Sequence, residues 1–139
     1  MRETMNAMSL EDERDITAVI VRYGTAIDTR DWGLFRSCFT DDFRGDYGQF
    51  GNWHSREAFA ATMQQMHESV GPTLHRMSNT VIACAADDTR ARTYVDAILT
   101  PRQADDSHHQ AVGYYDDELV RTREGWKIRS RRFTAVRIT

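Results

Sequence analysis

The hydrophobic pattern of the chain changes its period after Gly71–Pro72, and this change constrains the possible folds more than any other feature of the sequence. In the second half, segments rich in β-branched and aromatic residues are separated by short polar turns, a pattern typical of antiparallel strands. The segments cover residues 75–86, 90–102, 108–122 and 125–139. Asp87–Asp88 and Glu124–Gly125 suit hairpin turns, and residues 101–107 suit a longer loop. The second half is therefore predicted to be an antiparallel meander.

The first half has helical spacing instead. Ser9 is a suitable N-cap, and the apolar residues after it recur at the i, i+4, i+7 and i+11 positions of an amphipathic helix. These apolar residues are Ile16, Ile20, Tyr23 and Ile27. A short helix is expected from Trp32 to Phe39, followed by a turn at Asp41–Asp42 and by strand and loop over residues 42–53.

A third helix is expected between Ser55 and Gly71–Pro72, where the apolar residues again have helical spacing. Three helices followed by a meander of strands predict the α+β class. A strongly curved, mostly antiparallel sheet that folds around the first helix would form a cone-shaped α+β barrel with an internal pocket. The length of 139 residues suits one domain, which we place at residues 9–139 after a flexible tail at residues 1–8.

The charge and the composition argue against several classes of partner. A net charge of -3 and an isoelectric point near 5.9 give no general attraction to nucleic acid or to an anionic membrane. No apolar run approaches the roughly 20 residues that span a bilayer, and the first residues lack the apolar segment of a signal peptide. Cys38 and Cys84 lack zinc-type spacing, and the histidines form no metal-binding motif. We expect a cytoplasmic protein with reduced thiols and no metal.

Asp28 is the residue of the first helix that most needs an explanation, because it lies at the edge of the apolar stripe. Burying a carboxylate there costs several kcal/mol unless a hydrogen-bonding or protonated group meets it. The alternative is a solvated helix end. The candidate partner is His75, which opens the first long strand; by the period of two, it shares a face with Met77, Asn79 and Val81. This mixed face suits a pocket lining, whereas the alternative for His75 is a histidine satisfied by a backbone carbonyl.

An aspartate–histidine pair has a specific chemistry. The carboxylate fixes one imidazole tautomer and stabilises the protonated ring, so the other nitrogen can act as a base near neutral pH. A tyrosine nearby, such as Tyr23, can donate a hydrogen bond to an oxygen that becomes negative or departs. The combination suits proton abstraction beside a carbonyl group or elimination across a carbon–carbon bond.

Several segments of the chain resemble the SnoaL-like branch of the nuclear transport factor 2-like superfamily. The segments are EDERDITAVIVRYGTAIDTRDW, FTDDF, LHRMSN and EGWKIRSRRF, within a resemblance that runs from about Leu10 to Phe133. The resemblance implies an α+β cone with a deep pocket. Related branches include scytalone dehydratase, bile-acid 7α-dehydratase and hexachlorocyclohexane dehydrochlorinase, which use an Asp–His dyad for elimination without a cofactor. It also implies a homodimer or homotrimer that assembles through the outer face of the sheet.

The resemblance further implies roles for particular residues. Asp28 and His75 match the dyad, Tyr23 matches the tyrosine before the aspartate of the bile-acid dehydratase, and Arg131 matches an active-site arginine of the dehydrochlorinase. The alternative for Arg131 is one charge in a basic strand. By alternation His109 and Tyr115 share a face of their strand, and the resemblance implies that this face points inward. A shift of one residue in the register would place His108 there instead of His109. The alternative for both histidines is a solvated loop edge. Further residues expected to contact a substrate are Phe43, Tyr47, Phe59, Met63 and Asn79.

The function predicted from these residues is that of a cofactor-independent lyase, of the dehydratase type, acting on a hydrophobic cyclic or polycyclic small molecule. His75 would be the base, Asp28 its orienting partner, and Tyr23 the acid or oxyanion donor. Two alternatives remain at this point. An isomerase or a polyketide-cyclase-type enzyme would use the same base, and a non-catalytic small-molecule-binding module would keep the pocket without turnover.

Overall fold

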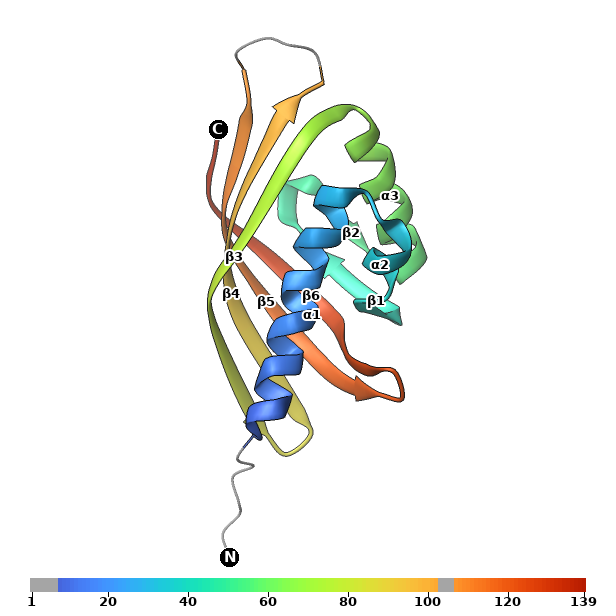
Figure 1. The fold of residues 1–139 in the computed structure, drawn as a ribbon, viewed down its shortest axis with the longest axis vertical. Helices are drawn as coiled ribbons and strands as arrows, with labels where there is room; N and C mark the ends of the chain where they lie inside the picture. The colour runs from blue at the N-terminus through green and yellow to red at the C-terminus, as the bar shows by residue number, and fades with distance from the viewer. Residues whose placement is uncertain (1–7, 103–106) are drawn as a thin grey trace, which may run out of the picture.

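Three helices pack into the concave side of one six-stranded sheet (Figure 1). The computed structural model describes residues 8–102 and 107–139, so all of the predicted N-terminal tail except Met8 lies outside the described residues. The helices are α1 (Leu10–Thr29), α2 (Trp32–Arg36) and α3 (Arg56–Glu68), with a 3-10 turn η1 (Gly48–Phe50). The strands are β1 (Phe39–Asp46), β2 (Asn52–Trp53), β3 (Val70–Ala85), β4 (Asp88–Pro101), β5 (His109–Thr122) and β6 (Gly125–Ile138). The predicted α+β class is confirmed.

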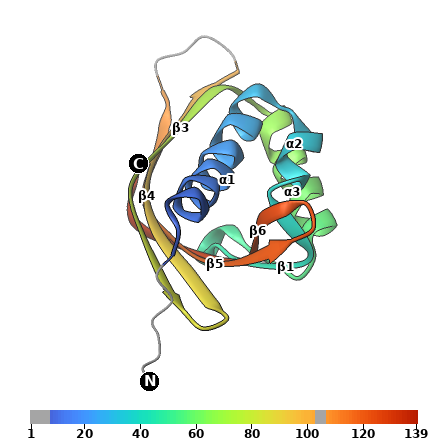
Figure 2. The same cartoon turned by 60° about the horizontal axis from the view of Figure 1, so that its bottom comes forward.

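The sheet has the order β2-β1-β6-β5-β4-β3, and its two edge strands do not pair, so the barrel is open. Strands β3 to β6 form the predicted antiparallel meander, whereas β1 runs parallel to β6. Irregularities of register interrupt β3 near Val70–Thr73 and Ser78–Val81, and such bulges bend a strand. The long strands consequently curve around α1, which lies along the inside of the sheet (Figure 2).

Helix α1 forms because its N-terminal cap and its hydrophobic pattern both favour a helix over these residues. The Ser9 hydroxyl accepts a hydrogen bond from the backbone N–H of Asp12 at 3.0 Å, as predicted for an N-cap. The predicted stripe is fully buried, and it consists of Ile16, Ile20, Tyr23 and Ile27. The helix ends at Arg30, whose left-handed backbone (φ 60°) lets its N–H reach the carbonyl groups of Ala26 and Ile27.

Two boundaries differ from the prediction. The second helix stops at Arg36, and residues 39–46 form β1, so Asp41–Asp42 lie in a strand rather than a turn. The third helix stops at Glu68, and Gly71–Pro72 belongs to β3 rather than to a helix end. Gly71 is needed in the strand because a Cβ atom there would lie 2.6 Å from the carbonyl oxygen of Pro101 on β4. Pairing with β4 therefore places Gly71 and Pro72 in a strand, although the sequence predicted that they end a helix.

Candidate active site

An apolar cavity of about 280 Å³ lies between α1, α3, η1 and strands β3 to β6. The polar side chains in its wall are few, as is usual for a small-molecule site. They include His67, His75, Tyr23, Tyr47 and Tyr115. The volume is near the lower end of the roughly 300–1,000 Å³ typical of ligand pockets, which favours a compact ligand.

Asp28 and His75 meet at the wall of this cavity. His75 Nδ1 donates a hydrogen bond to Asp28 Oδ1 at 2.8 Å, and the backbone N–H of His75 donates to Oδ2, also at 2.8 Å. Because an ionised carboxylate only accepts, Nδ1 carries the proton and Nε2 is the unprotonated nitrogen of the neutral ring. Asp28 is therefore not a solvated helix end, and a backbone carbonyl is not the partner of the His75 ring.

Gly24 allows this contact by letting α1 approach β3 closely. It precedes Asp28 by about one turn of the helix. A Cβ atom on Gly24 would lie 3.2 Å from the His75 carbonyl oxygen and 3.1 Å from Met77 Cε, tighter than most side-chain contacts. The absence of a side chain at Gly24 thus sets the distance between the helix and the strand that carry the dyad.

A chain of hydrogen bonds extends behind the dyad. The Thr73 hydroxyl donates to Asp28 Oδ1 at 2.8 Å, and Arg30 Nη1 donates to that hydroxyl at 3.0 Å. Burial alone would raise the pKa of Asp28, but hydrogen bonds from His75 and Thr73 and the charge interaction with His75 outweigh it and hold the pKa below its ordinary value. The carboxylate is thus kept ionised. Thr73 and Arg30 were missed in the sequence because the bonds from Thr73 to Asp28 and from Arg30 to Thr73 form only in the tertiary structure.

Three tyrosine hydroxyls form a cluster beside His75. The hydroxyl groups of Tyr23 and Tyr47 lie 3.0 Å apart, and the Tyr115 hydroxyl donates to that of Tyr23 at 3.5 Å. The Tyr23 ring stands edge-on to His75, with 6.2 Å between ring centroids. Burial raises the pKa of all three tyrosines, so each hydroxyl keeps its proton and remains a donor at neutral pH.

Arg131 supports these tyrosines and does not itself line the apolar cavity. It makes two hydrogen bonds to Asp117, at 2.7 and 2.9 Å, and both side chains are completely buried. Its guanidinium group lies 3.8 Å from the centroid of the Tyr115 ring and 4.3 Å from that of Tyr23. The structure thus places Arg131 behind the tyrosine rings rather than in the wall of the cavity. The sequence did not reveal Asp117 as its partner.

The other predicted contact residues divide into two groups. Tyr47, Met63, His109 and Tyr115 line the cavity, His109 at its exposed edge where Nδ1 donates to the Thr139 carbonyl at 3.3 Å. Phe43 and Phe59 do not line it; they are fully buried in the aromatic core, with their ring centroids 4.9 Å apart. Their expected role as pocket walls is wrong, because β1 and α3 turn both rings toward each other.

Asn79 is also placed wrongly by the sequence. The strict alternation that put it beside His75 breaks at the bulge between Ser78 and Val81, where Asn79 adopts a positive φ of 54°. Asn79 and Val81 are consequently exposed, and Thr80 and Ile82 continue the inward face. One additional residue in a strand reverses every later side chain, which explains the error.

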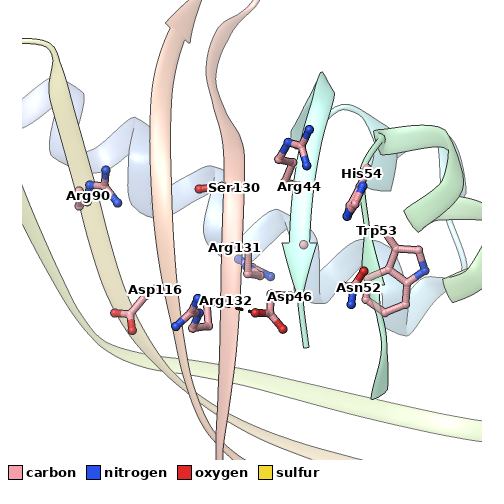
Figure 3. Close-up of a pocket in the computed structure, with 11 residues that line it drawn as sticks. Arg44, Asp46, Asn52, Trp53, His54, Arg90, Asp116, Ser130, Arg131 and Arg132 are labelled. Carbon is pink, nitrogen blue, oxygen red and sulfur yellow. Dashed lines mark ion pairs between the residues drawn. The ribbon is translucent and has the colours of Figure 1, made fainter. Parts of the chain in front are cut away.

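A second hollow lies on the opposite face of the sheet, from β4 across β5, β6 and β1 to β2 (Figure 3). It measures about 590 Å³ and carries mostly charged side chains, among them Arg44, Arg90 and Arg132. Several of these charges are paired across the surface, such as Arg132 with Asp46 at 3.7 Å. Arg131 borders this hollow too, but its side chain is buried. The hollow lacks the buried base and the apolar wall of the first cavity, which remains the better candidate.

The described residues contain no group of three or more His, Cys, Asp or Glu side chains arranged to hold a metal ion. Within the same residues, no helix has the length and apolar character needed to cross a bilayer.

A family model for the SnoaL-like domain matches residues 8–132 of the chain. The chain belongs to the SnoaL-like domain family. No curated protein matches its sequence significantly. The resemblance inferred from the motifs is therefore confirmed at the level of the family.

Solved structures share this SnoaL-like fold at low sequence identity. The Kfla4162 protein from Kribbella flavida is 22% identical, covers 93% of each chain and has a TM-score of 0.86. A protein from Novosphingobium aromaticivorans, provisionally named scytalone dehydratase, is 21% identical over 94% of this chain and 87% of its own, with a TM-score of 0.86. The Type 2 hexachlorocyclohexane dehydrochlorinase LinA is 17% identical over 94% of this chain and 88% of its own, with a TM-score of 0.82.

Proposed function

We propose that this SnoaL-like protein is a cofactor-independent lyase that eliminates water, or a comparable leaving group, from a compact hydrophobic ring compound. The observation that carries the proposal is the 2.8 Å hydrogen bond between Asp28 and His75, with His75 in the wall of an apolar cavity. Two proteins of the same fold bear the names of a dehydratase and a dehydrochlorinase, and both names describe eliminations.

The proposed reaction uses His75 as the general base. Nε2 of His75 takes a proton from a substrate carbon next to a carbonyl group, and Asp28 stabilises the imidazolium that forms. The electron pair of the broken C–H bond becomes the new C=C bond while the bond to the leaving oxygen breaks. Tyr23 donates its hydroxyl proton to that oxygen, which departs as water, and the proton held by His75 returns to Tyr23. No step requires an oxidant or a reductant.

The apolar wall of the cavity supports this chemistry. An apolar wall strengthens the interaction between the imidazolium and the carboxylate, because the local dielectric constant is low. The buried tyrosine cluster keeps Tyr23 protonated and oriented. The stacking of Arg131 on Tyr23 and Tyr115 holds both rings in place.

The experiment that tests the proposal compares Asp28→Asn with Asp15→Asn, a substitution on the exposed side of the same helix. Turnover of hydroxylated cyclic ketones should fall by about 100-fold or more in Asp28→Asn and should not change in Asp15→Asn. Mass spectrometry of the product should show the loss of water. A product of unchanged mass would instead establish an isomerase or cyclase, and saturable binding without any turnover would establish a binding module.

A further inference from the structure

The cavity contains a second imidazole that the proposed mechanism does not use. His67 lies on the last turn of α3 and is only 6% exposed. Its ring centroid is 6.3 Å from that of His75, and both rings line the same cavity. One compact ligand can therefore touch both imidazoles at the same time.

The tautomer of His67 follows from its single hydrogen bond. Nδ1 lies 2.7 Å from the carbonyl oxygen of Met63, and a carbonyl group cannot donate, so Nδ1 carries the proton. Burial lowers the pKa of His67 and outweighs the opposite effect of the Met63 carbonyl, while Arg30 and His75 lower it further. The ring is therefore neutral, and the lone pair of Nε2 is free.

Nε2 of His67 is a buried acceptor with no hydrogen-bond partner among the described residues. A buried polar atom left without a partner destabilises the folded chain, and such atoms are rare in folded proteins. The only comparable side-chain atom within residues 8–102 and 107–139 is Nη1 of Arg131. A hydrogen-bond donor brought by a ligand would remove this destabilisation.

We infer that His67 Nε2 accepts a hydrogen bond from a hydroxyl group of the ligand, and that it selects ring compounds bearing an alcohol or a phenol. This inference rests on the proposed function in so far as it treats the ligand as a substrate, but a binding measurement alone can test it. Because Nε2 has no proton, His67 cannot protonate a departing oxygen. The hydroxyl that it binds is thus one that the substrate keeps, whereas the leaving group belongs beside Tyr23.

The chemistry of the site also says what His67 rejects. An ether, a ketone or a nitro group has only lone pairs to place against Nε2, so the acceptor would stay unpaired and would face a second acceptor. Selection against the group without a donor is usually stronger than the gain from the hydrogen bond itself, because it leaves a buried atom unsatisfied. The distinction between a hydroxyl group and its methyl ether is therefore the sharpest test.

The experiment measures the binding of 2-naphthol and of 2-methoxynaphthalene by calorimetry at pH 7.5. The proteins are the wild type, His67→Phe, which keeps a ring without the acceptor, and His67→Gln, whose amide oxygen can accept. The loss of one buried hydrogen bond should weaken 2-naphthol binding about tenfold in His67→Phe. Binding of 2-methoxynaphthalene should change less than about twofold, and His67→Gln should recover most of the 2-naphthol affinity.

A direct readout accompanies the affinities. Nitrogen-resolved NMR should show the Nε2 resonance of His67 shifting on addition of 2-naphthol and remaining in place with 2-methoxynaphthalene. The inference is overturned if 2-naphthol does not bind the wild type saturably, if both ligands weaken equally in His67→Phe, or if neither does. Turnover assays on the wild type separate the two proposals, because a wild type that turns over no hydroxylated cyclic ketone but keeps the hydroxyl preference in binding refutes only the lyase.

Discussion

At the scale of single residues, the site depends on a few buried polar side chains whose partners are far away in the sequence. Asp28 receives hydrogen bonds from the ring and backbone of His75 and from the hydroxyl of Thr73. Each removes part of the cost of burying the carboxylate, and together they hold its pKa down. The geometry of the Asp28–His75 pair therefore depends on at least three residues rather than two.

Thr73→Val tests this interpretation because valine keeps the shape of threonine and removes its hydroxyl. The substitution should raise the pKa of Asp28 and leave Arg30 without one acceptor. We expect turnover to fall about 3- to 10-fold, the effect of one lost hydrogen bond of ordinary strength. The check is kcat in both proteins between pH 5 and 8. The control is Thr40→Val, which removes an exposed hydrogen bond from the Thr40 hydroxyl to Asp42. Equal kcat values would mean that Thr73 only packs.

His67 makes folding stability depend on pH. Its pKa in the folded chain lies below the roughly 6.5 of an unfolded chain, so the unfolded chain binds more protons between the two values. Stability contributed by the neutral ring is therefore complete above about pH 6.5 and is lost as the pH falls toward the folded pKa. Urea unfolding at pH 7.5 and 5.0 should show a smaller loss of stability in His67→Phe than in the wild type. An unchanged difference would exclude His67 as the cause, and exposed His54→Gln is the control.

At the scale of secondary-structure elements, the packing of α1 on β3 determines the dyad geometry. Gly24→Ala should stabilise the isolated helix by about 1 kcal/mol, but its Cβ would lie 3.1–3.3 Å from Met77 and His75. The helix must then move away from the strand by a few tenths of an ångström. We expect little net change in stability and a several-fold loss of turnover, because catalysis is more sensitive to small displacements than folding is.

Gly33→Ala on α2 is the matched control for that substitution, since the nearest atom to its added Cβ is 3.7 Å away. It should leave turnover unchanged. Thermal unfolding and kcat should be measured on all three proteins. Full activity in Gly24→Ala would show that the α1–β3 distance is not critical for the reaction.

At the scale of the whole molecule, the outer face of the sheet is where we expect copies of the chain to associate. Tyr94, Tyr114 and Val136 line one hollow there, and Tyr94 and Val136 are 50% and 71% exposed. We predict a dimer or a trimer by light scattering, and the monomer mass for the double variant Tyr94→Glu, Val136→Glu, because buried unpaired charges oppose association. Leu10→Glu, on the distant start of α1, should keep the wild-type mass. A monomeric wild type would contradict the prediction.

The sequence by itself determined the class of the fold, the stripe of α1 and the four long strands, because these features depend on local period and on short-range turns and caps. It also identified Asp28, His75 and Tyr23, although only as residues that could meet. Short elements were less well predicted, as β1 and the start of β3 show, since pairing with distant strands overrode local preference there.

Only the tertiary structure decided which side chains share the cavity. The bulge in β3 turns Asn79 outward, and the packing of β1 on α3 buries Phe43 and Phe59 in the core. Arg131 forms a buried hydrogen bond to Asp117. The tertiary structure also revealed the unpaired Nε2 atom of His67. The physical reason is that register, burial and hydrogen-bond partners depend on contacts between residues distant in the chain, and no local pattern encodes them.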